Sequence, residues 1–156
     1  MLQFAQWCNN SRLAEAIRDS PWIFPTLEIV HLLGLAVLGG TILIVDLRLL
    51  GFGLKQLSSA QLAAQVSPWT RAALAAMLTS GALMFTSEAI DCYNSLPFRV
   101  KMVLLLAAAT FMFTVRQRVI RSGTGASSSW MERLTGVTSL GLWTGVAAAG
   151  RTIAFW

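Results

Sequence analysis

The sequence predicts an all-α integral membrane protein: an up-down four-helix bundle preceded by a short interfacial helix. Only 12% of the residues are charged and 55% are hydrophobic, whereas a soluble domain usually carries about 25% charged residues. Long uncharged stretches recur along the chain, at 29–45, 72–87, 102–115 and 134–150. None shows the two-residue alternation of a barrel strand, so helices are the predicted spanning elements.

A single membrane domain is expected over 1–156, with its elements in simple succession. The first is a short helix over about 11–20, with Ser11 as its N-cap and Pro21 after its end, lying on the membrane surface. The uncharged stretches are shorter than the ~20 residues that cross a ~30 Å hydrocarbon core, but flanking apolar and long charged side chains extend them. The predicted transmembrane helices are about 24–50, 69–90, 98–120 and 131–153.

The distribution of basic residues predicts the orientation. With four spans, the loops after the first and third helices share one side, and that side carries an excess of Lys and Arg, whereas the other is close to neutral. The positive-inside rule places the basic side in the cytoplasm, so both termini face out. The net charge of +5 is spread over helix ends rather than gathered in one patch, which argues against nucleic acid as a partner.

Titratable residues at the predicted outer ends of the helices form a candidate site. Glu28 and His31, the only histidine, lie one turn apart in an apolar stretch and about 60° apart around the helix. An up-down bundle brings the outer ends of all four helices together. The predicted ligand- or cofactor-binding cluster is Glu28, His31, Glu88, Lys101 and Arg151.

A second ionic cluster is expected at the cytoplasmic ends. Asp46 lies in line with Glu28 on the first helix, ~27 Å away at 1.5 Å per residue. Because charged groups at this depth normally face protein partners, Asp46 is expected to pair within the bundle. The expected members of this cluster are Asp46, Arg48, Arg71, Arg116 and Arg133. For both clusters, ion pairs that hold the helices in register are the structural alternative to a binding site.

The outer cluster admits several ligands. His31 with Met84 or Met102 offers imidazole and thioether groups, which suit copper(I). The same residues could give haem b His/Met ligation, since one histidine excludes bis-histidine ligation. Glu28 and His31 could instead serve a quinone or another proton-coupled substrate without any metal. A di-iron centre is disfavoured because it needs the E-x-x-H motif twice.

The first predicted helix carries a spaced set of residues: Pro25-x-x-Glu28-x-x-His31-x-x-Gly34, then Gly39 or Gly40, then Asp46-x-Arg48-x-x-Gly51. This pattern resembles a family of small four-helix bacterial inner-membrane proteins of unknown function. The resemblance implies the bacterial inner membrane, in which the outward-facing termini expected from the positive-inside rule would lie in the periplasm. The helix is also distantly similar to that of CopD-type copper-resistance proteins and cytochrome b561-like bundles, which carry several histidines where this chain has one.

The two cysteines, Cys8 and Cys92, fall on the same predicted side. In the periplasm they could form a disulfide, with isolated thiols as the alternative. The sequence shows no nucleophile elbow, phosphate loop or C-x-x-C pair, which disfavours hydrolase or kinase chemistry and leaves enzymatic activity unassigned.

Three functional hypotheses follow. The first is a membrane protein that binds a metal, haem or small redox ligand at Glu28 and His31. The second is a non-catalytic subunit or scaffold in a homo-oligomer or larger complex, with the outer cluster as an ion-pair staple. The third is a small transporter. Rows of small residues suit close helix packing in the second case, at Gly141, Gly145 and Ala149 and at Ala72, Ala76 and Ser80.

Overall fold

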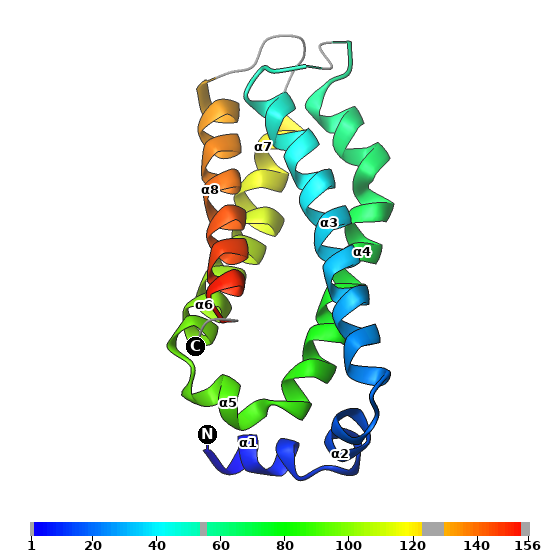
Figure 1. The fold of residues 1–156 in the computed structure, drawn as a ribbon. Coiled ribbons are helices and arrows are strands. Elements are labelled where there is room, and N and C mark those ends of the chain that lie inside the picture. The colour runs from blue at the N-terminus through cyan, green and yellow to red at the C-terminus, as the bar shows by residue number, and fades with distance from the viewer. Residues whose placement is uncertain (1, 54–55, 123–129, 154–156) are drawn as a thin grey trace.

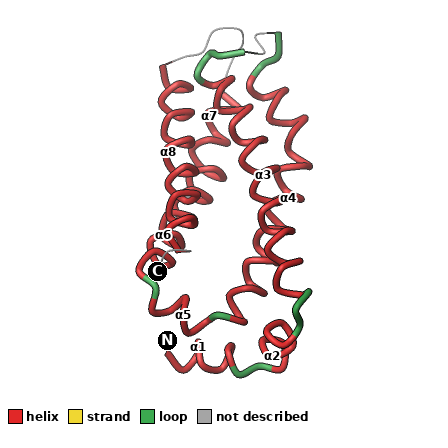
Figure 2. The backbone as a smooth tube through the Cα atoms, viewed as in Figure 1, coloured by secondary structure: helices red, strands yellow, loops and turns green. Residues whose placement is uncertain are grey.

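The computed structural model describes residues 2–53, 56–122 and 130–153. Figure 2 shows that this part of the chain is almost wholly helical, with short loops and no strand. The all-α prediction is therefore confirmed for these residues. The elements are α1 (Leu2–Asn9), α2 (Arg12–Asp19), α3 (Ile23–Leu49), α4 (Ser59–Ser87), α5 (Ala89–Asn94), α6 (Leu96–Phe111), the π-helical segment η1 (Met112–Arg116), α7 (Gln117–Ser122) and α8 (Trp130–Ile153).

The long helices lie side by side in two pairs (Figure 1). α3 packs against α4, and α6 packs against α8. Where α3 ends, at the top of Figure 1, the pairs meet, with α3 against α8 and α7 against α4. At the opposite end the pairs diverge, and α1, α2 and α5 lie across the molecule. We call these the Asp46 end and the His31 end, after a polar residue that α3 carries toward each.

Two stretches of the described chain are long and apolar enough to cross a membrane. They are Ile23–Leu49 and Leu96–Ser122, the second comprising α6, η1 and α7. Only 22% and 11% of their most apolar windows are buried inside the protein, so most of these side chains face outward. α4 and α8 are similarly long but carry more hydroxyl side chains, and neither passes the same test. The prediction of a membrane protein is supported in this coarser form.

Short polar motifs set several helix starts. The Ser11 hydroxyl accepts a hydrogen bond from the Ala14 amide at 3.1 Å, so it is the N-cap of α2, as predicted. The preceding helix α1, which the sequence pattern does not predict, packs against α5. α4 begins at Ser59 rather than near 69, because Ser58 and Gln61 form a reciprocal capping box.

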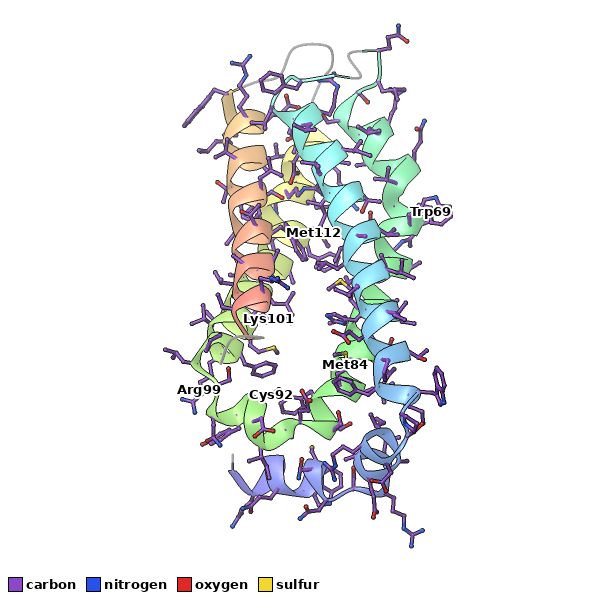
Figure 3. The ribbon with its side chains drawn as sticks, in the orientation of Figure 1. Trp69, Met84, Cys92, Arg99, Lys101 and Met112 are labelled. Carbon is purple, nitrogen blue, oxygen red and sulfur yellow. The ribbon has the colours of Figure 1, made fainter. Side chains whose placement is uncertain are left out.

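The helix that starts at Leu96 changes geometry near its middle. At η1 the chain becomes π-helical, which adds a residue to the turn and shifts the direction of the side chains beyond it. Met112 and Arg116, at the two ends of this segment, are both buried. Figure 3 places Met112 between the two helix pairs.

Two hydrophobic clusters fill the molecule from its middle to the Asp46 end. The one nearer the middle consists of Leu38, Ile42, Ala73 and Met112. The one nearer the loops consists of Val45, Leu49, Leu62 and Ile120. Each joins α3 and α4 to the η1–α7 segment, so the core holds the helix pairs together at this end.

Candidate functional site

A buried ion pair joins the two helix pairs at the Asp46 end. Asp46 is 0% exposed, and Nε of Arg116 donates a hydrogen bond to its Oδ1 at 2.9 Å. The hydroxyl of Ser139 on α8, also 0% exposed, faces the same carboxylate. Losing either charged partner would leave the other as an uncompensated buried charge, so the pair holds α3 and η1 in one register.

The other predicted members of this cluster do not pair with Asp46. Arg48 is buried, but its Nε donates to the carbonyl oxygen of Leu57 at 2.7 Å, which secures the loop before α4. Arg71 and Arg133 are exposed, and neither pairs with Asp46.

Helix geometry explains why Arg133 does not reach the carboxylate. Ser139 marks the level of Asp46 on α8, and Arg133 comes six residues earlier, ~9 Å farther along the axis and on a different face. The expectation that Arg71 and Arg133 pair with Asp46 is therefore corrected by the structure.

At the His31 end, the imidazole is held against α4. His31 Nδ1 lies 3.0 Å from the Ser80 hydroxyl oxygen, and that hydroxyl donates its single proton to the carbonyl oxygen of Ala76 at 2.6 Å. Ser80 therefore accepts a hydrogen bond from Nδ1–H, and in the Nδ1–H tautomer Nε2 is the acceptor nitrogen. The backbone of Met77 also hydrogen-bonds to the imidazole. Gly81 permits this placement, because a Cβ there would lie 3.1 Å from Cε1 of His31.

Lys101 approaches the same region from the other helix pair. It is half-buried on α6 and lies beside α8 (Figure 3), where a Cβ at Gly150 would be 3.7 Å from its Nζ. Its positive charge acts on His31. No carboxylate of the described chain forms an ion pair with Lys101. The His31 end thus carries two half-buried nitrogen groups on opposite helix pairs, near enough for the charge of Lys101 to act on His31.

The remaining predicted residues of the outer cluster are exposed. Glu28 lies on α3 and Glu88 follows the end of α4, and their negative charges act on each other. Arg151 is exposed on α8. No ion pair links Glu28 or Glu88 to Lys101. The predicted cluster is therefore open, with His31 and Lys101 half-buried and the two carboxylates at its rim.

The predicted metal and haem ligands gain no support from the geometry. Met84 is half-buried on α4 (Figure 3), while Met102 on α6 is 47% exposed. Among the residues that the structure describes, no group of three or more His, Cys, Asp or Glu side chains is placed to hold a metal ion. Copper or haem b at His31 stays a prediction.

The two cysteines are free thiols, so the disulfide considered from the sequence is not formed in the structure. Cys8 is buried against Ala89, and Cys92 is half-buried on α5. Burial, helped by the negative charges of Glu88 and Asp91, raises the pKa of the Cys92 thiol to about 11. Cys92 is therefore protonated at neutral pH and a weak nucleophile.

Two contacts at the His31 end do not follow from the sequence patterns. The sequence pattern places Ser80 only in a row of small packing residues. Its hydroxyl group lies at the depth of His31, and this is the sequence signal that could have predicted their hydrogen bond. Arg18 on α2 donates through Nη1 to the carbonyl oxygen of Ser87 at 3.0 Å and through Nη2 to that of Asn9 at 2.8 Å. Arg18 thereby links α1 and α2 to the end of α4. This contact joins residues far apart in the sequence, so no local sequence motif predicts it.

Comparison with known proteins identifies a family but no function. The model of a family of unknown function, DUF6644, matches residues 4–156. No curated protein and no solved structure matches the chain. The family match agrees with the expected membership of a family of unknown function. It supports neither the first-helix signature nor the resemblance to CopD-type and cytochrome b561-like proteins.

Proposed function

The chain belongs to the DUF6644 family, and we propose that it is an integral membrane protein that binds a small hydroxyl-bearing redox ligand, such as a quinol, at its His31 end. Its four spans would be α3, α4, the continuous helix from α6 to α7, and α8, running up and down in a bacterial inner membrane with both termini in the periplasm. The observation that carries the proposal is half-buried His31, fixed by Ser80, opposite half-buried Lys101.

The outward-facing apolar surface supports the membrane part of the proposal. Leu33, Val103, Leu106 and Phe113 are each at least 60% exposed. Contiguous apolar surface of this kind is unfavourable in water and suits lipid. Polar side chains of α4 and α8 that face the protein interior are compatible with a membrane-spanning helix. Ser80 of α4 and Ser139 of α8 are buried in this way.

The free hydrogen-bonding atoms define the ligand class. Neutral His31 offers Nε2 as an acceptor, and the ammonium group of Lys101 offers donors. A ligand hydroxyl donates to Nε2, while a carbonyl or phenolate oxygen accepts from Lys101. Glu28, exposed one turn before His31, provides a proton acceptor at the rim. A quinol combines these features with an apolar body that suits a site between helices.

A structural subunit is the second candidate, and the buried Asp46–Arg116 pair favours it. An ion pair that fixes helix register serves a scaffold without any ligand, and the exposed apolar faces of α3 and α6 would then contact partner helices or a second copy. A transporter is less well supported, because Leu38, Ile42 and Met112 fill the interior between the two ends without a polar step.

The test starts with detergent-purified protein prepared without chelators. Elemental analysis and an absorption spectrum reveal tightly bound copper, iron or haem. A short-chain ubiquinol is then titrated under reducing conditions, and its binding is followed by quenching of the fluorescence of the six tryptophans. We expect saturable binding that His31→Ala and Lys101→Met each weaken about tenfold, the loss of one good hydrogen bond.

Met102→Leu is the matched control, because it neighbours Lys101 and removes only a thioether. It should bind the quinol like the wild type. Stoichiometric metal or a Soret band that His31→Ala abolishes would replace the quinol proposal with metal or haem binding. Equal quinol binding by all four proteins would refute a ligand site at His31 and leave the scaffold as the leading candidate.

A further inference from the structure

A cationic pocket lies at the opposite end of the molecule from His31, and we propose that it binds a phosphate group. The pocket has a volume of about 480 Å³ and lies between α3, α4 and the η1–α7 segment. The recognised chemistry is the phosphate oxyanion, carried either by an anionic lipid or by a soluble phosphate compound. This site is separate from the proposed quinol site and does not depend on it.

The side chains around the pocket match a phosphate. Arginines from three elements line it, Arg71 of α4, Arg116 of η1 and Arg121 of α7, and no carboxylate is among the described lining residues. Gln117 and Thr70 add neutral hydrogen-bonding groups. Guanidinium groups bind phosphate oxygens through paired charge-assisted hydrogen bonds, so three in one pocket favour this ligand over a neutral one.

Arg116 is the fixed point of the pocket. It is 7% exposed, its Nε is held by Asp46, and its Nη2 has no hydrogen-bond partner in the described part of the chain. The Asp46 contact orients the guanidinium before any ligand arrives, which lowers the entropy lost on binding. Arg116 also ends the π-helical segment, a geometry found frequently at functional sites.

Apart from the hydroxyl groups of Thr41 and Ser67, the rest of the lining is apolar, which favours an amphiphilic phosphate. Ile42, Val45, Leu74 and Phe113 form the wall beside the arginines. In the proposed orientation this end faces the cytoplasm, where anionic lipid headgroups attract arginine and lysine side chains. A lipid would place its phosphate at the arginines and an acyl chain along this wall, whereas a soluble phosphate compound would use the arginines alone.

The experiment uses full-length protein in a neutral detergent and phosphate-free buffer. The probes are phosphatidylglycerol, zwitterionic phosphatidylcholine and inorganic phosphate, and the readouts are lipid adducts in native mass spectrometry and the Tm. The double variant Arg71→Gln/Arg121→Gln leaves the Asp46–Arg116 pair intact. Arg118→Gln, an exposed residue of α7 outside the pocket, is the matched control.

We expect one phosphatidylglycerol per protein, bound at least tenfold more tightly than phosphatidylcholine. The double variant should lose at least tenfold in affinity and the control should keep it. Retention of bound phosphatidylglycerol in millimolar inorganic phosphate would identify the lipid as the source. A Tm increase with inorganic phosphate that the double variant lacks would identify a soluble phosphate. Equal binding of the two lipids without any phosphate effect, or equal behaviour of the double variant and the control, would overturn the proposal.

Discussion

The buried Asp46–Arg116 pair gives the sharpest stability prediction. Arg116→Met keeps much of the side-chain volume but removes the cation, so the carboxylate of Asp46 is left with no opposite charge in a site that is 0% exposed. Truncating one partner of a buried pair costs about 3–5 kcal/mol. At about 2–4 °C per kcal/mol for a chain of this length, the Tm should fall by roughly 6–20 °C.

A double-mutant cycle separates the pair from general damage to the core. Asp46→Asn/Arg116→Met removes both charges and should be more stable than the sum of the two single losses predicts. Arg133→Met is the control, because Arg133 is exposed and makes no ion pair with Asp46. It should change the free energy of unfolding by no more than about 0.5 kcal/mol.

The assay is thermal unfolding followed by circular dichroism in one detergent and in phosphate-free buffer, so that occupancy of the arginine pocket does not differ between variants. If Arg116→Met and Arg133→Met unfold at the same temperature, the pair does not stabilise the protein. Strict additivity in the double variant would show that the two side chains act independently and would likewise refute the reasoning.

Three further predictions concern packing, capping and reactivity. Gly136→Ala should lower the free energy of unfolding by about 1–3 kcal/mol, because its Cβ would lie 3.0 Å from the carbonyl oxygen of Asp46. Gly141→Ala is the control, because its Cβ would enter open space and should not lower stability. Equal Tm values for the two variants would contradict this. Ser11→Ala removes the N-cap of α2 and should cost about 0.5–2 kcal/mol in the same assay. Since burial raises the pKa of Cys92 from 9.0 to about 11, iodoacetamide should alkylate Cys92 roughly a hundredfold more slowly than in the denatured chain below pH 9. The difference should close as the pH passes 11, and an equal rate at pH 8 would show an accessible thiolate.

Local sequence signals were sufficient where the relevant interaction is local. The N-cap at Ser11 involves residues three positions apart, and the uncharged stretches lie within single helices. The Ser58–Gln61 capping box, which starts α4 ahead of the predicted span at about 69, is likewise a local motif that can be read from the sequence.

The composition and periodicity of this chain by themselves determined its helical class, its apolar outer surface and the choice of Glu28, His31 and Asp46 as polar residues that need an explanation. Only the tertiary structure decided their partners. The rotation of each helix about its axis decides which arginine reaches Asp46 and which hydroxyl holds His31. In the continuous helix from α6 to α7, the residue added by η1 also contributes to this rotation. Those rotations are set by packing across the whole bundle, so no window of the sequence contains them.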